Sequence, residues 1–270
     1  MIAIRSEREI ALLREANQIV AEVHVAMARM AQPGVDTGTL DAEAERIIRS
    51  YGAVPAFLGF QGFPASTCIS VDEEVVHGIP GNRTLQAGEV VSIDVGVIHQ
   101  GYVGDAACTH AVGAIDADRR RLLETTDLAL SAAIRAARAG NHLEAIGHAV
   151  EAACKPAGLG IVRDFVGHGI GAQMHEPPQI PNFVTGNGGP KLRAGMVLAI
   201  EPMVNLGTHE VRVLDDGWTV VTADGRASAH FEHSIVVRED GGEILSGTPL
   251  LVWGQARETA APGAPQRSDS

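Results

Sequence analysis

Five short segments of the chain place an acidic residue or a histidine among apolar residues and glycines, where a solvent-exposed charge is not expected. The five residues are Asp94, Asp105, His168, Glu201 and Glu232. A charged carboxylate in apolar surroundings costs several kcal/mol unless it is paired or binds a metal, and few lysines or arginines lie near these segments in the sequence. The pattern therefore predicts a site at which divalent cations neutralise the acids.

Four carboxylates and one imidazole can hold two metal ions if some of the carboxylates bridge them. Sites of this kind, with metals roughly 3.5–4 Å apart, activate water for hydrolysis. The set is rich in oxygen and contains no thiolate, so it favours manganese, iron or cobalt over a closed structural zinc site. The chemistry indicated is metal-assisted hydrolysis.

Three of the eleven histidines stand out from the rest, most of which we interpret as packing or solvent residues. His77 follows an apolar pair and precedes Gly-Ile-Pro, while His168 and His175 enclose the glycine-rich loop Gly-Ile-Gly-Ala-Gln-Met. Of these last two, one can be a metal ligand and the other a free imidazole that donates to an oxyanion. The interpretation of each as an ordinary core histidine stays open at this point.

Two other patterns are poor indicators of a site. The run Gly167-x-Gly169-x-Gly171 is followed by Pro177-Pro178, so no helix N-terminus is available to bind phosphate. His175-Glu176 is not part of a His-Glu-x-x-His motif, because the second histidine is missing. Cys68 could be a nucleophile, but a small buried apolar role is favoured.

The elements that must position these residues alternate between helices and strands. A capping box at Ser6 and Glu9 opens a helix that runs to Met30, and a second helix is expected over residues 39–50. Short β-branched runs follow from 54 to 112. Helical periodicity returns over 118–137 and over 141–155, the latter opened by a second box at Asn141 and Glu144, and strand texture resumes from 161 to 237.

The order of two helices and strands thus occurs twice, and matching letters support a duplication. Leu85–Val97 aligns with Leu192–Val204 at an offset of 107 residues, which places Asp94 opposite Glu201. A pseudo-twofold packing of the halves would bring both acids to one central axis. The alternative is that both acids lie on a solvated face of a sheet.

Composition limits the partners and the location. The chain has 270 residues, 45% of them apolar, which is enough for one large core or two modest ones. A formal charge of −12 repels phosphate backbones and anionic lipids, so neither nucleic acid nor membrane is an expected partner. Three cysteines without CxxC spacing, no signal-peptide pattern and no membrane-length apolar run predict a cytoplasmic protein.

Together these segments resemble the type I methionine aminopeptidases of the short bacterial form, over nearly all of residues 5–240. The likeness is carried by GFPASTCISVDEEVVHGIPG, VSIDVGV, GYVGDAACT, VGHGIGAQMHEPPQIPN, GMVLAIEPMV, DDGWTV and HFEHSIVV. The resemblance implies an α+β pita-bread fold, in which a pseudo-twofold duplicated unit of two helices plus antiparallel strands forms a curved central sheet with helices on its outer face. We expect one catalytic domain over residues 1–252, with pseudo-repeats of about 1–115 and 116–250, and a disordered tail over 253–270.

The resemblance assigns roles to the residues that the charge pattern selected. Asp94, Asp105, His168, Glu201 and Glu232 match the five ligands of a site for two divalent metal ions. A hydroxide that bridges the metals would attack the carbonyl of an N-terminal methionine, with Glu201 moving protons. His175 would stabilise the oxyanion and His77 would steer the peptide nitrogen.

The same resemblance implies a pocket for the methionine side chain and identifies two departures from the family pattern. The pocket positions are filled by Phe57, Phe60, Phe63, Cys68, Met174 and Trp218. Phe60 stands where relatives often have tyrosine, so a hydroxyl is missing there. Ala106-Ala107 replaces small hydroxyl residues after Asp105, which puts hydrogen bonding around that ligand in question.

The resemblance also bears on substrates, partners and competing functions. It implies removal of the initiator methionine from nascent proteins when the second residue is small, by a monomer that works near the ribosome exit region. One alternative is a pita-bread peptidase that cleaves Xaa-Pro bonds, although such relatives usually carry a large N-terminal domain. The other is a non-catalytic pita-bread module that binds peptides, although such modules typically lose ligands and this chain has the full set.

Overall fold

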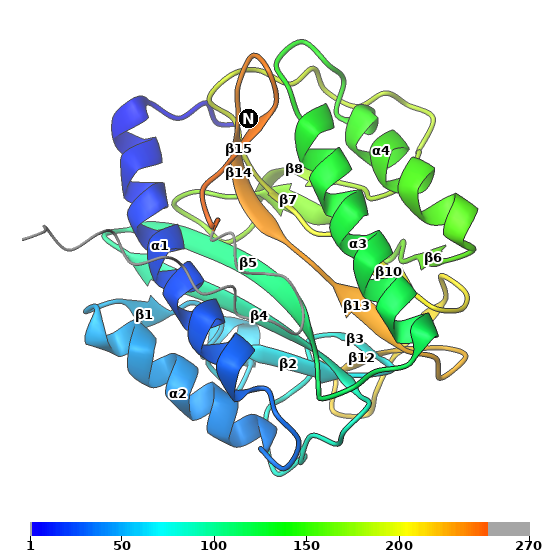
Figure 1. The fold of residues 1–270 in the computed structure, drawn as a ribbon. Helices are drawn as coiled ribbons and strands as arrows, with labels where there is room; N and C mark the ends of the chain where they lie inside the picture. The colour runs from blue at the N-terminus through cyan, green and yellow to red at the C-terminus, as the bar shows by residue number, and fades with distance from the viewer. Residues whose placement is uncertain (1, 248–270) are drawn as a thin grey trace, which may run out of the picture.

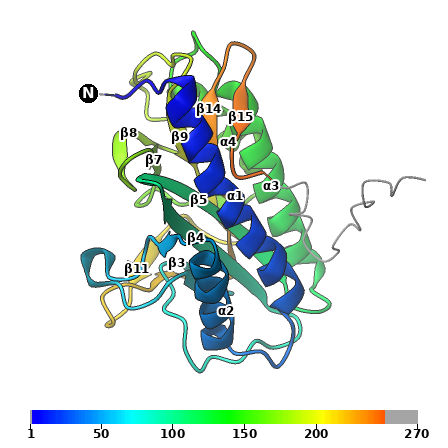
Figure 2. The same cartoon turned by 90° about the vertical axis from the view of Figure 1, so that its left-hand side faces the viewer.

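The computed structural model describes residues 2–247, and Figures 1 and 2 show its fold in two views. The expected tail, residues 253–270, and the expected domain end at 252 lie outside the described residues. Among the helices of residues 2–247, none has both the length and the apolar character that crossing a membrane requires.

The helices of the described residues come in two pairs, one in each half of the chain. They are α1 (Glu7–Met30), α2 (Thr37–Ser50), α3 (Ala117–Ala136) and α4 (Glu144–Cys154), with short 3₁₀ turns η1 (Phe60–Gly62) and η2 (Lys155–Ala157).

The strands are short except for two, and they fall into hydrogen-bonded groups rather than one continuous ladder. The strands are β1 (Val54–Pro55), β2 (Cys68–Val71), β3 (Glu74–Val76), β4 (Val90–His99), β5 (Tyr102–Ala111), β6 (Gly160–Ile161), β7 (Gly167–Gly169), β8 (Glu176–Ile180), β9 (Val197–Ile200), β10 (Met203–Asn205), β11 (Val211–Val213), β12 (Val220–Thr222), β13 (Ser228–His230), β14 (His233–Val237) and β15 (Gly242–Ile244).

All pairs of named strands in the described residues are antiparallel, as the resemblance implies. Strands β1, β2 and β5 surround β4, and β15, β14, β9, β7 and β8 form a five-stranded sheet in that order. Two smaller sheets have the orders β13-β10-β6 and β11-β12-β3. Helices α1 and α3 run across one face of these strands, as both views show (Figures 1 and 2). This is the α+β layer arrangement that the sequence predicts, with the opposite face of the strands left for a site.

Cap chemistry explains where three helices begin and why one sequence-based boundary is wrong. Ser6 and Glu9 form the predicted capping box of α1, while Asp36 and Asp116 accept backbone N–H groups at the starts of α2 and α3. The second predicted box does not form, because Asn141 donates its side-chain N–H to the carbonyl of Ala136 at 2.9 Å. Helix α4 therefore begins at Glu144, three residues later than expected.

The two halves repeat backbone conformation as well as sequence. Gly34 and Gly140, which lie in the turns after the first helix of each half, both have φ of 93°, and Gly52 and Gly158, which follow the second helices, both have φ of 67°. Residues with a Cβ rarely adopt such angles. The same left-handed turns thus occur at offsets of 106 residues, which supports the predicted duplication.

The core is divided between the halves. One cluster is built by α1, α2 and the sheet around β4, and includes Val20, Ile48 and Ile93. A second is built by α3, α4 and the five-stranded sheet, and includes Leu198 and Phe231. A third cluster joins the halves where α1 meets β5, β9 and β14. Burial of apolar surface therefore fixes the position of β4 and β5 relative to β7, β9 and β14.

Candidate metal centre

The five predicted ligands come from both halves of the chain. Asp94 lies in β4 and Asp105 in the adjacent strand β5. His168 lies in β7, and Glu201 directly follows β9; these two strands are neighbours in the five-stranded sheet. Glu232 lies between β13 and β14, and its backbone N–H donates to a β5 carbonyl at 2.8 Å. This hydrogen bond ties the second half of the chain directly to the strand that carries Asp105.

The backbone of Asp105 is held from two other elements. Its N–H donates to the side-chain oxygen of Asn17 on α1 at 3.2 Å, and its carbonyl accepts the hydroxyl of Ser234 on β14 at 2.8 Å. The approach of α1 depends on Gly104, because a Cβ there would lie 2.7 Å from the backbone nitrogen of Asn17. The Gly-Asp pair of the sequence thus lets a helix pack close enough to fix the acid.

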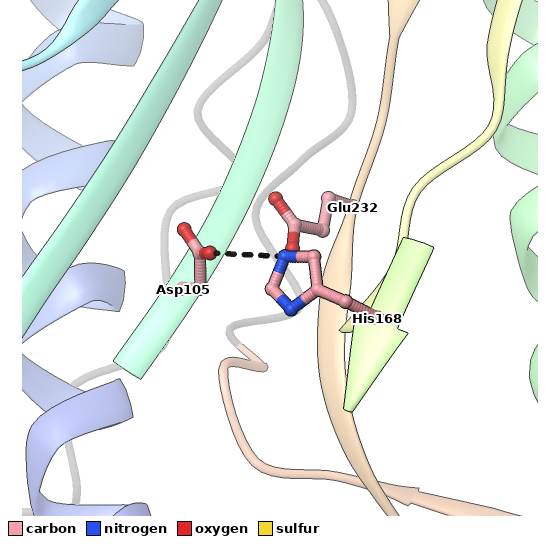
Figure 3. A group of neighbouring side chains, drawn as sticks. All are labelled: Asp105, His168 and Glu232. Carbon is pink, nitrogen blue, oxygen red and sulfur yellow. Dashed lines mark ion pairs between the residues drawn. The ribbon is translucent and has the colours of Figure 1, made fainter. Parts of the chain in front are cut away.

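Three of the ligand side chains converge on one small space, which Figure 3 shows. Asp105, His168 and Glu232 each offer an atom within 4.8 Å of the others. His168 Nε2 lies 3.9 Å from Asp105 Oδ2 and 3.5 Å from Glu201 Oε1. Glu201 is therefore adjacent to the group formed by Asp105, His168 and Glu232, and its contact with that group is to His168.

The tautomer of His168 decides what can occupy this space. Its Nδ1 lies 3.0 Å from the carbonyl oxygen of Gly169, so Nδ1 must carry the proton and donate. Burial lowers the pKa of His168 to about 4, which keeps the ring neutral. Nε2 therefore presents a lone pair toward the carboxylates of Asp105 and Glu201, an arrangement that is repulsive without a cation between them.

The carboxylates themselves lack compensating partners. Asp94 Oδ1, Asp105 Oδ1 and Glu232 Oε1 are buried and accept no hydrogen bond from the described residues. Burial raises the pKa of Asp94 to about 7. Burial, followed by the charge of Asp94, also raises the pKa values of Asp105 and Glu201 far above the usual range. Burial does the same to Glu232, and repulsion from the charge of Asp105 adds to the rise of its pKa.

The donor set thus fits a divalent cation. It combines one oxygen each of Asp94, Asp105 and Glu232 that accepts no hydrogen bond from the described residues with an imidazole lone pair that faces Asp105 and Glu201. Within residues 2–247 no lysine or arginine forms an ion pair with any of the five residues. A metal is the partner whose charge and coordination would satisfy these groups.

A cavity of about 220 Å³ opens over this group and brings together all the residues that the sequence selected. Its walls include the four acids and the one imidazole of the predicted metal centre together with His77 and His175. The six residues that the resemblance assigns to a methionine pocket line the same cavity: Phe57, Phe60, Phe63, Cys68, Met174 and Trp218. Their side chains form an apolar wall beside the polar group.

A glycine in β4 makes room for this wall. A Cβ at Gly96 would lie 2.7 Å from Phe57 Cε1 and 2.8 Å from Met174 Cε. Gly96 faces Asp105 across the β4–β5 ladder. The glycine two residues after Asp94 therefore lets apolar side chains pack directly beside the acidic ones.

His77 and His175 enter the cavity from different loops. His77 has φ of 60°, and its ring packs edge-on against Phe165 and Trp218 at centroid distances of 5.5 and 6.4 Å. The ring of His175 lies 4.4 Å from that of His168. Burial lowers the pKa of both His77 and His175, so each is neutral near pH 7 and keeps one N–H to donate and one lone pair.

Phe165, Met203 and His230 also line the cavity, although sequence reasoning did not select them. His230 is 2% exposed, and burial lowers its pKa to about 3. His230 stands two residues before Glu232 in the segment His-Phe-Glu-His, but strand β13 ends at His230. The alternation of side chains along a strand therefore does not extend to Glu232, and the sequence contains no local signal for His230.

The two departures from the family pattern have visible consequences. Phe60 faces His175 with ring centroids 5.5 Å apart and offers no hydroxyl. Ala106 and Ala107 are fully buried beside Asp105, and Oδ1 of that acid accepts no hydrogen bond from the described residues. The contacts that position Asp105 are made by its backbone, to the side chains of Asn17 and Ser234, and not by hydroxyl groups on the two residues that follow it.

His24 on α1 predicts acid sensitivity. Its Nε2 lies 2.9 Å from the carbonyl oxygen of Ala106, and burial lowers its pKa from 6.5 to about 4. The unfolded chain therefore binds a proton at His24 before the folded chain does, so stability falls as the pH drops through this window. We expect His24 to contribute about 3 kcal/mol to the loss of stability between roughly pH 7 and pH 4.

Urea unfolding of metal-free wild type and His24→Gln at both pH values measures this contribution. Glutamine keeps an N–H for Ala106 but does not titrate. The free-energy difference between the two proteins should change with pH by the stated amount. An equal difference at both pH values would show that His24 does not couple folding to protons.

Comparison with known proteins gives one consistent result. A model of metallopeptidase family M24 matches residues 11–239. Methionine aminopeptidase 1 of Bacillus subtilis is 47% identical over 246 residues, which cover 91% of this chain and 99% of that protein. The methionine aminopeptidase of Clostridium perfringens matches with the same identity and the same coverage.

Solved structures agree with this result. The crystal structure of methionine aminopeptidase from Thermotoga maritima matches with a TM-score of 0.90 and 40% identity, over 92% of this chain and all of that one. Prolidase from Pyrococcus horikoshii matches with a TM-score of 0.73 at 22% identity, over 91% of this chain and 63% of that one. The prolidase likeness concerns the fold alone.

Proposed function

Because the chain belongs to metallopeptidase family M24, we propose that its cavity binds the N-terminal methionine of a peptide and hydrolyses the bond that follows it. Its relatives over nine-tenths of the chain are methionine aminopeptidases, so the chain is a metal-dependent aminopeptidase that removes initiator methionine. The single observation that carries the assignment of the site is the buried, unpartnered acidic group beside an apolar pocket in one cavity.

The metal centre is proposed to be formed by Asp94, Asp105, His168, Glu201 and Glu232. A divalent metal bound there supplies Lewis-acid chemistry, because it polarises a carbonyl group and lowers the pKa of water. We propose two ions of the manganese, iron or cobalt class, since four carboxylates exceed what one ion needs and oxygen donors dominate.

Three side chains are proposed to act on the substrate. The carboxyl group of Glu201 lines the cavity beside His168, so it is placed to take a proton from water and pass it to the leaving amine. His175 is neutral and donates an N–H to the oxygen that gains negative charge. His77 contacts the peptide nitrogen and orients the scissile bond.

The apolar wall is proposed to select methionine. A thioether side chain fits among aromatic rings, and its sulfur makes favourable contacts with their edges. Within this wall, the rings of Phe63 and Trp218 pack edge to face with centroids 5.1 Å apart, and Met174 also lines the cavity. We further propose that the substrates are nascent chains with a small second residue, and that the protein acts as a cytoplasmic monomer near the ribosome exit region.

The two competing functions have less support. Likeness to prolidases rests on 22–23% identity and on 63–65% of their length. A binding module without metals would have no use for unpartnered buried acids, which destabilise a metal-free fold. The acidic group is therefore better explained by hydrolysis than by peptide binding alone.

Metal reconstitution tests the proposed function. Protein stripped of metal is expected to release no methionine from Met-Ala-Ser, and addition of manganese, iron or cobalt under anaerobic conditions should restore release. The Xaa-Pro control substrate should remain intact with each metal. Free amino acids are measured by chromatography. Cleavage of the proline substrate alone, or inactivity with every metal, would contradict the proposal.

A further inference from the structure

His230 occupies a place in the cavity that the proposed chemistry leaves without a role. Its Nε2 is buried, has no hydrogen-bond partner among the described residues, and lies 3.7 Å from Glu201 Oε2. An imidazole nitrogen in such a position costs free energy unless it binds something. The carboxylate that it approaches is that of Glu201, the proposed proton carrier.

The backbone of His230 is fixed from the other half of the chain. Its N–H donates to the hydroxyl oxygen of Thr109 on β5 at 2.8 Å, and its carbonyl accepts that hydroxyl's proton at 2.8 Å. His230 also pairs with Met203 across the β10–β13 ladder. The ring therefore faces Glu201 because rigid strands place it there, not because a flexible loop happens to bring it close.

Glu201 lies between two imidazoles that offer different atoms. Its Oε1 lies 3.5 Å from His168 Nε2, and its Oε2 lies 3.7 Å from His230 Nε2. His168 cannot donate to Glu201, because its single proton is on Nδ1 beside the Gly169 carbonyl. Of the two imidazoles, His230 is therefore the one that can supply an N–H to this carboxylate.

We propose that His230 is a positioning residue that donates its Nε2–H to Oε2 of Glu201 and thereby holds Oε1 toward the metal centre. The inference rests on the proposed function. A carboxylate with one oxygen held by an N–H cannot rotate freely, so its other oxygen keeps the direction in which a ligand and proton carrier is needed. Shortening of the 3.7 Å separation to hydrogen-bond distance would also satisfy a buried nitrogen that has no partner among the described residues.

Two substitutions at residue 230 test the donor. His230→Leu removes the N–H, and we expect it to weaken cobalt binding by roughly 10- to 100-fold and to lower kcat with little change in KM. His230→Gln places an amide N–H at similar reach, and we expect its affinity and kcat to return to within about threefold of wild type. Isothermal titration calorimetry with cobalt and the visible absorption of the bound cobalt measure the centre independently of turnover.

His110→Leu is the matched control. His110 is also a buried histidine, on β5, but it does not line the cavity, so cobalt affinity should stay at the wild-type value. Wild-type affinity in His230→Leu would overturn the proposal. A loss in His230→Gln as large as that in His230→Leu, with both proteins folded by circular dichroism, would also overturn it. Wild type that binds cobalt but releases no methionine would contradict the proposed function alone.

Discussion

Substitution of Asp105 by asparagine is expected to abolish methionine release and, in the metal-free protein, to raise stability. Asp105 is buried among acids that repel it, and its pKa is raised accordingly. Above the ordinary pKa of 3.8, the folded metal-free chain binds more protons than the unfolded chain, so its stability falls as pH rises toward neutrality. Asparagine does not titrate and removes this penalty, so we expect the metal-free variant to be more stable than metal-free wild type near pH 7.

Metal should reverse the order of stability. A ligand that binds only the folded state stabilises it in proportion to the logarithm of its concentration over Kd. Wild type should therefore melt at a higher temperature with manganese, whereas the Asp105→Asn protein should change little. Differential scanning fluorimetry with and without metal, at neutral and mildly acidic pH, makes the measurement.

Asp118→Asn removes the same charge from an exposed position on α3. It should change neither the activity nor the response to metal. If metal-free Asp105→Asn melted below wild type at neutral pH, the repulsion inferred from the buried acids would be wrong.

The sequence predicted the helices well where local chemistry decides them and less well where tertiary contacts compete. Ser6 and Glu9 are three residues apart in the sequence and cap α1 as expected. Asn141 and Glu144 have the same spacing, but Glu144 instead accepts backbone N–H groups of a distant loop at residues 186 and 188. Sequence spacing cannot reveal that competition, because the partner lies more than forty residues away.

Two independent signals in the sequence selected the site residues, and the structure brings these residues together in one cavity. Asp94 and Glu201 were indicated by the duplication, and Asp105 and Glu232 by charges in apolar surroundings. The structure gathers all four around His168, although only Asp105 and Glu232 share the closest group with it. The distances between these carboxylates depend on how the sheet around β4 packs against the five-stranded sheet. Periodicity within a strand does not carry that information.

His230 illustrates the remaining gap between sequence and site. As a histidine in an apolar strand it looks like an ordinary core residue, and most buried histidines are satisfied by nearby backbone. Only the position of Glu201, which follows a strand of another sheet, shows that the ring faces a carboxylate. The contact between His230 and Glu201, about thirty residues apart in the sequence, decides whether His230 is a core residue or a site residue. No local sequence pattern reveals this contact.

Substitution of His175 by alanine is expected to lower kcat by roughly 10²- to 10³-fold while metal affinity stays near the wild-type value. The magnitude is that of removing one donor to a developing oxyanion. Burial keeps His175 neutral, so it acts through an N–H and not through charge. Its ring lies against His168, yet His175 belongs to no group of closely spaced ligand atoms among the described residues.

His168→Ala provides the contrast that separates the two roles. It removes the imidazole lone pair that faces Asp105 and Glu201, so it should lose both metal affinity and activity. His175→Gln should recover part of kcat, because its amide can donate, while His148→Ala on the exposed side of α4 should match wild type. Steady-state kinetics on Met-Ala-Ser and calorimetric titration with manganese distinguish these cases. Equal losses of metal affinity in the alanine variants of residues 168 and 175 would mean that His175 acts as a ligand, since a pure oxyanion donor leaves the ground-state metal centre unchanged.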